Sequence, residues 1–217
     1  LCIVATTTLP RCCSGSKPVS SSVIAAVVGD GDAGWDDHVA HRYPDFALTD
    51  PWITEQLSIR DCFCHRSGVA GLVGADLETI GVSRDEILRR LRYVPISGVF
   101  RQTYSYSNMM MTLGAEATVV PLGQTWEDVA ETRVFAPLGM TSTSYRYQDY
   151  LDHTNRSELH VRVDGAWASE IKRNPEPQAP AGGLSTSARD LAEWMRMQLA
   201  VGMFDGEQVI DNAALSE

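Results

Sequence analysis

Ser14 and Lys17 are separated by three positions at the start of an apolar run from Val19 to Val28. In a helix, residues three apart share a face, so the Ser14 hydroxyl and the Lys17 amine can lie side by side. A serine hydroxyl becomes a good nucleophile when a neighbouring base takes its proton, and a lysine amine whose pKa is lowered by burial is such a base. The spacing therefore indicates acyl transfer by a serine that uses lysine where other hydrolases use histidine.

The same spacing occurs a second time, at Ser169 and Lys172. This second copy lies between a predicted hairpin and a proline-rich loop, with no apolar helix behind it. The first copy opens the most apolar helical segment in the N-terminal half of the chain. We therefore expect Ser14 and Lys17 to be the reactive pair, with a helix N-cap and a solvated lysine as the alternative for these two residues.

The elements that must position this pair are mostly helices. Polar N-caps, helical spacing of apolar residues and proline or glycine stops predict helices over 17–28, 58–65, 83–93, 106–120, from 125 to the stop at 137–139, and 187–199. Residues 160–163 alternate polar and apolar side chains before Asp164-Gly165, which predicts a β-hairpin. We expect residues 1–13 to be an extended lead-in and the glycine-rich residues 68–82 to be a surface loop.

Composition limits the class of protein and its partners. The 217 residues, 44% hydrophobic and 21% charged, suit a single globular domain without an apolar run long enough to span a bilayer. Lys and Arg number 18 against 28 Asp and Glu, which gives a net charge of −10. This acidic balance argues against nucleic acid and anionic membrane surfaces as partners.

The cysteines do not form the pattern of a secreted disulfide framework, because Cys12 and Cys13 are adjacent and Cys62 and Cys64 are two apart. Cys62, Cys64 and His65 could be metal ligands, but no second ligand cluster has zinc-like spacing. We favour buried small residues here, a structural role for His65, and a protein without metal or cofactor.

A tyrosine and an asparagine, Tyr106 and Asn108, open the predicted Met-rich helix. Ser-x-x-Lys followed by Tyr-x-Asn resembles the serine β-lactamase-like, penicillin-binding family, in the branch of class C β-lactamases, D-Ala-D-Ala carboxypeptidases, D-aminopeptidases and related esterases. Further stretches resemble the family in the same order, from about Arg11 onward: 35–37, 57–61, 65–68, 135–140, 181–184 and 188–191.

The resemblance implies a role for each of four residues. Ser14 matches the acylated nucleophile, and Lys17 matches the lysine that activates it. Tyr106 matches the tyrosine that shuttles protons, and Asn108 matches the asparagine that hydrogen-bonds Lys17 or a substrate amide. A cationic Lys17 near Tyr106 would favour the phenolate, because an opposite charge stabilises the charged form. Lys17 and Tyr106 both remain possible general bases.

The chain departs from the family pattern at both ends. The third motif, a Lys/His-Thr/Ser-Gly triplet on a sheet edge, has no match, nor do the strands that precede the nucleophile helix. We therefore expect residues 1–217 to form a single, partial domain of the α+β β-lactamase/transpeptidase-like fold, which covers mainly the helical region and lacks most of the central antiparallel sheet. Loss of the sheet should expose the apolar nucleophile helix to water. It should also remove one of two oxyanion N–H donors, which typically costs about 10²–10³ in rate.

Two functions follow from these expectations. The first is a serine hydrolase that cleaves an ester, an amide or a β-lactam through a Ser14 acyl-enzyme. The second is a catalytically impaired fragment or a non-catalytic binding module that keeps the family scaffold. An oligomer, or another chain that supplies the sheet, is a further expected kind of partner.

Overall fold

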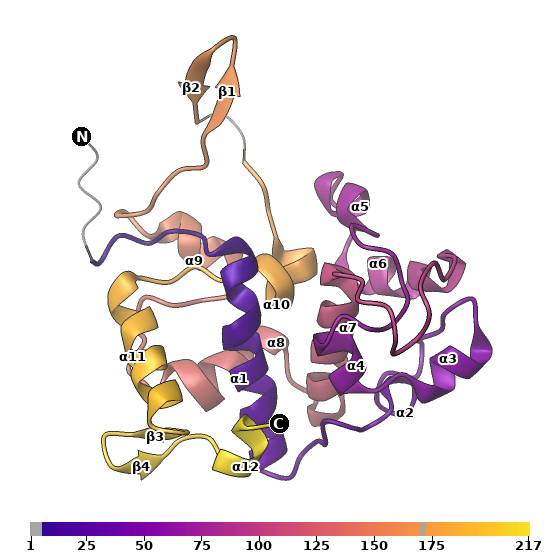
Figure 1. Ribbon diagram of the computed structural model, residues 1–217. Helices are drawn as coiled ribbons and strands as arrows, with labels where there is room; N and C mark the ends of the chain where they lie inside the picture. Colours follow the sequence, from indigo (N-terminus) through magenta and orange to yellow (C-terminus); the bar gives the residue numbers. More distant parts are fainter. Residues whose placement is uncertain (1–5, 170–171) are drawn as a thin grey trace.

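The computed structural model describes residues 6–169 and 172–217, and these residues are mainly helical (Figure 1). The longer helices are α1 (Ser16–Gly29), α6 (Arg84–Arg90), α7 (Asn108–Val119) and α11 (Ala188–Leu199). The shorter helices are α2 (Val39–Arg42), α3 (Pro51–Gln56), α4 (Ile59–Phe63), α5 (Ala75–Thr79), α8 (Trp126–Ala130), α9 (Tyr147–Asp152), α10 (Ala179–Gly182) and α12 (Asn212–Leu215). A π-helical turn, Glu131–Phe135, continues α8.

The core is built around α1, which crosses the middle of the molecule between α11 and α7 (Figure 1). Helices α7, α10 and α12 and the π turn pack against it. The residues from Ser22 to Val27 are all buried. Small and β-branched side chains allow this close approach on several sides, as the sequence predicts.

Serine side chains on α1 join it to its neighbours. The Ser20 hydroxyl lies 2.6 Å from the Tyr145 hydroxyl and donates to the carbonyl of Pro180, also at 2.6 Å. The Ser22 hydroxyl accepts hydrogen bonds from Trp194 Nε1 and Gln198 Nε2. Buried polar groups are costly without partners, so these bonds explain how a serine-rich helix can be central.

The expectation that α1 would be exposed is wrong. Neighbouring helices cover Val19 and residues 22–27, whereas in the first two turns Pro18 is exposed and Lys17 and Ser21 are partly accessible. The helical elements around α1 therefore supply enough apolar surface to bury it.

Two small antiparallel sheets make up the extended β structure in the described part of the chain. Strands β1 (Val161–Val163) and β2 (Ala166–Ala168) form the predicted hairpin, which projects from the body of the molecule (Figure 1). Strands β3 (Met203–Phe204) and β4 (Glu207–Gln208) form a shorter one near the C-terminus. The expectation of a mainly helical region with little of the central sheet is confirmed.

Most predicted helices are present, and their caps explain where they begin. The Ser107 side chain accepts a hydrogen bond from the Met110 N–H, so the predicted 106–120 helix starts at Asn108. Ser58, Ser83, Thr125 and Ser187 cap α4, α6, α8 and α11 in the same way.

Two segments for which the sequence predicts no helix contain one. The 68–82 stretch holds α5, which starts directly after Gly74 at φ 82°. The loop after Trp35 contains α2. Both helices are very short, so tertiary contacts rather than sequence periodicity decide their conformation.

Across the described segments, no helix combines the length and apolar character that crossing a membrane requires.

Candidate active site

Ser14 lies in a 3₁₀ turn, Cys13–Gly15, directly before α1, and it is exposed. Cys13 has φ 45°, a left-handed conformation that is unfavourable for a residue with a side chain. The Ser16 hydroxyl donates to the Cys13 carbonyl at 2.6 Å and accepts a hydrogen bond from the Leu184 N–H at 3.0 Å. The Ser16 hydroxyl therefore links the turn that contains Ser14 to the main chain of Leu184.

Tyr106 meets Ser14 across the site. The Ser14 Oγ and Tyr106 OH atoms are 2.7 Å apart, although the residues are separated by 92 positions. Tyr106 precedes the Ser107 N-cap of α7, so the start of this helix fixes the position of the tyrosine. Either hydroxyl can donate, which allows a proton to pass between the two oxygens.

Lys17 lies above the Tyr106 ring, with its Nζ atom 4.6 Å from the ring centroid. The same ammonium group donates to the Ala181 carbonyl of α10 at 2.7 Å. Burial alone would raise the pKa of Tyr106, but the nearby Lys17 ammonium and the Ser14 hydroxyl outweigh it and hold the pKa below its ordinary value. The structure thus brings Ser14, Lys17 and Tyr106 together.

Asn108, the first residue of α7, lies two residues beyond Tyr106. Its Oδ1 atom is buried and accepts no hydrogen bond from the residues that the structure describes. An unpartnered buried carbonyl is unfavourable, so this oxygen has an unused capacity to accept a hydrogen bond. The resemblance implies a hydrogen bond from Asn108 to Lys17 or to a substrate amide, but the Lys17 ammonium donates to the Ala181 carbonyl. The role of Asn108 therefore stays a prediction.

Two contacts of this site were not predicted from the sequence. One is the carbonyl of Ala181, which holds the Lys17 ammonium from 164 positions away. The other is the ring of His65, whose centroid lies 4.5 Å from that of Tyr106. Nothing in the local spacing of these residues signals either contact.

The other candidate residues lie outside this arrangement. Ser169 and Lys172, the second copy of the spacing, are both exposed beyond the β1–β2 hairpin, and residues 170 and 171 between them lie outside the described residues. Cys62 is buried, and burial raises the pKa of its thiol well above the usual value, whereas Cys64 is exposed. Within residues 6–169 and 172–217, no group of three or more His, Cys, Asp or Glu side chains could hold a metal ion.

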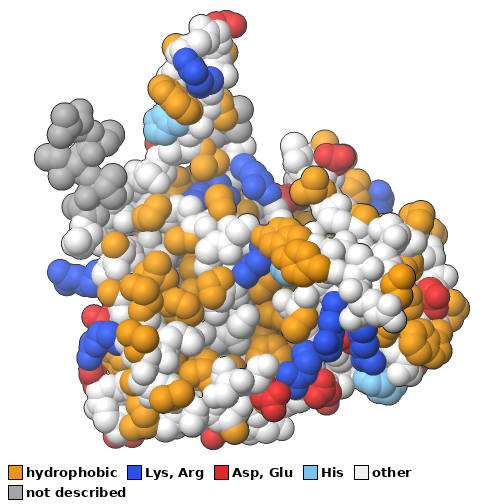
Figure 2. Space-filling model, viewed as in Figure 1, with side chains coloured by type: hydrophobic (Ala, Val, Ile, Leu, Met, Phe, Trp, Pro, Cys, Tyr) orange, Lys and Arg blue, Asp and Glu red, His pale blue; other side chains and the backbone are white. Residues whose placement is uncertain are grey.

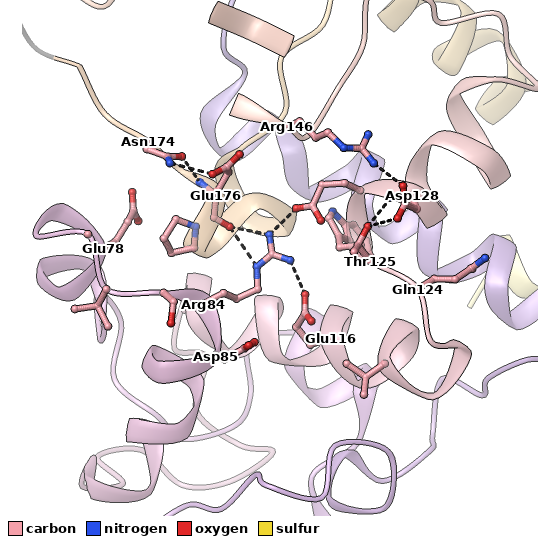
Figure 3. Close-up of a pocket in the computed structure, with 17 residues that line it drawn as sticks. Glu78, Arg84, Asp85, Glu116, Gln124, Thr125, Asp128, Arg146, Asn174 and Glu176 are labelled. Atoms are coloured by element: carbon pink, nitrogen blue, oxygen red, sulfur yellow. Dashed lines mark hydrogen bonds and ion pairs between the residues drawn. The ribbon is translucent and has the colours of Figure 1, made fainter. Parts of the chain in front are cut away.

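A large cavity of about 860 Å³ opens elsewhere, between α6, α8 and the 174–177 segment (Figure 3). None of the four candidate site residues lines it. The Arg84 guanidinium lies at its centre and pairs with Glu116 at 2.7 Å and Glu127 at 2.6 Å. This ion cluster joins α6, α7 and α8, and we assign it a structural role.

The surface on the α1 side combines apolar and basic side chains. Hydrophobic side chains gather over α1 and α11 on the face seen in Figure 2. Tyr104, whose ring contacts His65, is 70% exposed. This face of the molecule therefore carries exposed apolar side chains.

The mainly helical fold brings a serine, a lysine and a tyrosine together, and comparison with known proteins places the chain in a family. The family model described as Beta-lactamase matches residues 4–215, so the chain belongs to the β-lactamase family. This family comprises serine hydrolases and penicillin-binding proteins.

Three relatives illustrate the similarity. An unguisins hydrolase of Aspergillus campestris is 27% identical over 83% of this chain and 36% of its own length. Penicillin-binding protein 4 of Amycolatopsis lactamdurans is 27% identical over 93% of this chain and 54% of its own length. The crystal structure of a D-stereospecific amidohydrolase from Streptomyces sp. superimposes with a TM-score of 0.79 at 17% identity, over 97% of this chain and 65% of that one.

The structural match shows the β-lactamase/transpeptidase-like fold. The chain spans between a third and about half of the length of the two curated relatives. Their activities therefore bear on this chain only as proposals.

Proposed function

We propose that this chain carries the acylation centre of a serine hydrolase that cleaves an ester or an amide through a Ser14 acyl-enzyme. The observation that carries the proposal is the 2.7 Å contact between Ser14 Oγ and Tyr106 OH, with the Lys17 ammonium 4.6 Å from the tyrosine ring. A nucleophile within hydrogen-bond reach of a base that a third group orients is the arrangement expected for covalent catalysis.

In the proposed reaction, Tyr106 as phenolate accepts the Ser14 proton while Oγ attacks the carbonyl carbon of the substrate. The tetrahedral intermediate carries its charge on oxygen, near the Ser14 N–H. Tyr106 then returns the proton to the leaving alcohol or amine as the carbon–heteroatom bond breaks. Water, deprotonated by the same group, hydrolyses the acyl-enzyme and restores the Ser14 hydroxyl. Lys17 remains cationic in this scheme and stabilises the phenolate; the alternative, with Lys17 as the base, uses the same three residues.

The test is covalent labelling of the folded chain. Incubation with a fluorescent penicillin or a fluorophosphonate, followed by intact mass and peptide mapping, should show one adduct on Ser14. Ser14→Ala should abolish it. Ser169→Ala, which removes the second copy of the spacing, is the matched control and should leave labelling unchanged. A folded wild-type chain without an adduct would contradict the proposal.

The substrate class within this proposal is a small ester, a D-amino acid amide or peptide, or a β-lactam. The names of the relatives, a penicillin-binding protein and an unguisins hydrolase, together with a D-stereospecific amidohydrolase fold, support testing all three. A panel of p-nitrophenyl esters, D-Ala amides and nitrocefin separates them, and we favour the ester or D-amide classes over a dedicated β-lactamase.

A non-catalytic or impaired scaffold is the second candidate, because the described residues contain only two small two-stranded sheets and little of the central sheet. Under this alternative, Ser14→Ala would leave every measured property of the folded chain unchanged, ligand binding included. Assembly with another chain or with further copies is a related proposal. Native mass spectrometry that shows only a lone monomer would contradict it.

A further inference from the structure

His65 holds the main chain on both sides of Tyr106. Its carbonyl accepts the Ser105 N–H at 2.7 Å, and its Nδ1 atom accepts the Ser107 N–H at 3.3 Å. His65 itself has φ 55°, a left-handed conformation that turns the chain sharply after α4. A single residue thereby fixes the residue before and the residue after the tyrosine.

The imidazole also contacts the tyrosine directly. The His65 and Tyr106 ring centroids lie 4.5 Å apart at an angle of 41°, and the Tyr104 ring also contacts His65, edge-on at 5.8 Å. His65 is only 8% exposed, so its ring has little freedom to move. The Tyr106 ring therefore contacts both the His65 imidazole and the Lys17 ammonium.

The Ser107 hydrogen bond specifies the protonation state of His65. Since Nδ1 accepts a hydrogen bond from the Ser107 N–H, it must carry a lone pair, and the neutral ring has its proton on Nε2. Burial and the Lys17 ammonium both lower the pKa of His65, which favours this neutral form. The titratable groups that face the imidazole are Lys17 from α1 and Tyr104 and Tyr106 from the segment before α7.

We infer that neutral His65 is a positioning residue for Tyr106: it holds the main chain on either side of the tyrosine so that the hydroxyl meets Ser14. This inference rests on the function proposed above for Tyr106, and it goes beyond a packing role. Protonation of Nδ1 would break the Ser107 bond and place a second cation near Lys17. Displacement of a catalytic group by about 1 Å can cost on the order of 10²-fold in rate.

A matched pair of amide variants tests the inference. His65→Asn places an acceptor oxygen near the position of Nδ1, and asparagine tolerates the left-handed conformation. His65→Gln carries an amide of the same chemistry, but its polar atoms lie near the position of Nε2. We expect His65→Gln to lower the acylation rate constant by about 10- to 100-fold with little change in KM. His65→Asn should remain within about threefold of the wild type.

A second readout does not need catalysis. Ultraviolet titration of the phenolate, with Tyr106→Phe as the reference that identifies the signal, measures the pKa of Tyr106. In His65→Gln this pKa should rise toward its ordinary value, because the ring is released from Lys17, whereas His65→Asn should retain the wild-type pKa. A merely structural role would scale the amount of folded protein and leave the titration unchanged.

The outcomes separate the two proposals. Equal acylation rates in both variants, or an unchanged Tyr106 titration in His65→Gln, would overturn the positioning role while Ser14 labelling still supports the hydrolase. An unlabelled wild type would overturn the hydrolase, and the phenolate titration would still decide the role of His65. If His65→Gln does not fold, the wild type decides: below the midpoint of the NMR titration of the His65 Cε1–H signal, the Ser14 labelling rate must fall more steeply with decreasing pH than the Tyr106 titration alone requires. If Ser14 is not labelled, the Tyr106 ring signals, identified with Tyr106→Phe, must shift at the His65 midpoint, and an unchanged ring environment would overturn the positioning role.

Discussion

The Ser14 and Tyr106 hydroxyl oxygens lie 2.7 Å apart, so the serine proton can pass directly to the tyrosine. The pKa of Tyr106 is in turn lowered by the Lys17 ammonium. Removal of the phenol oxygen in Tyr106→Phe should lower the acylation rate constant by about 10²–10⁴-fold, the usual contribution of a general acid–base group. Stopped-flow labelling at saturating probe measures this loss. Tyr93→Phe, at an exposed tyrosine away from the site, is the control and should have no effect. A loss below about threefold would assign the base role to another group.

The pH dependence of acylation follows from the lowered pKa of Tyr106. If the phenolate is the base, the rate constant rises with pH through this pKa, at a pH below the ordinary value of about 10 for tyrosine. Lys17→Met removes the cation that favours the phenolate and should move this limb to higher pH as well as slow the reaction. The measurement is the labelling rate as a function of pH for both proteins. An unmoved limb would show that Lys17 does not tune the tyrosine.

At the scale of elements, the loop after α4 lies against the segment that carries Tyr106. A Cβ atom at Gly71 would lie 2.7 Å from the Tyr106 carbonyl oxygen, so a side chain there must push this main chain away. Gly71→Ala should therefore lower the acylation rate constant about tenfold or more, because the tyrosine is displaced. Labelling kinetics, normalised to folded protein, test this.

Gly114 offers the contrasting substitution. Its Cβ would lie 2.9 Å from Cys62 Cβ, where α7 packs on α4 at a distance from Ser14. Gly114→Ala should cost stability, about 1–3 kcal/mol for an overpacked core, with the rate per folded molecule unchanged. If Gly114→Ala slowed labelling as much as Gly71→Ala, a general loosening of the fold would explain both results.

The sequence predicts the local features of the fold and the site, but not the contacts between residues that are far apart in the chain. Ser14 and Lys17 are separated by one helical turn, and Ser83, Thr125 and Ser187 cap helices through bonds to the third residue on, so periodicity and caps predict them. The bond from Lys17 to Ala181 joins residues 164 positions apart, and the His65–Ser107 bond joins residues 42 apart. Such contacts depend on the tertiary arrangement, which local spacing does not specify. For the same reason the exposure expected for α1 was wrong, because its covering helices come from distant parts of the chain.

At the scale of the whole molecule, the cluster of Arg84, Glu116 and Glu127 joins three helices. Arg84→Met would leave two carboxylates largely buried without a cation, and loss of one partner of a buried pair typically costs about 3–5 kcal/mol. Chemical denaturation at neutral pH measures the change in the free energy of unfolding. Arg89→Met removes an exposed pair with Glu86 and should change it by less than about 1 kcal/mol.

The pH dependence of this loss has a definite sign. Burial raises the pKa of Glu116, although Arg84 opposes the effect, and without Arg84 the pKa should rise further. The folded state then binds more protons than the unfolded state, so the stability of Arg84→Met should increase as the pH falls from 7 toward 5. A loss that is independent of pH over this range would show that the cost comes from packing rather than from unpaired charge.

The turn before Ser14 has a practical consequence for inhibitor profiling. Cys13 carries an exposed free thiol next to the serine, and its main chain is held in a left-handed conformation by Ser16. An alkylating reagent at this thiol would add bulk beside the Ser14 hydroxyl without reacting with it. Inactivation by iodoacetamide could then be mistaken for the signature of a cysteine enzyme. Cys13→Ala, which keeps Ser14, Lys17 and Tyr106, would remove that sensitivity and reveal the nucleophile.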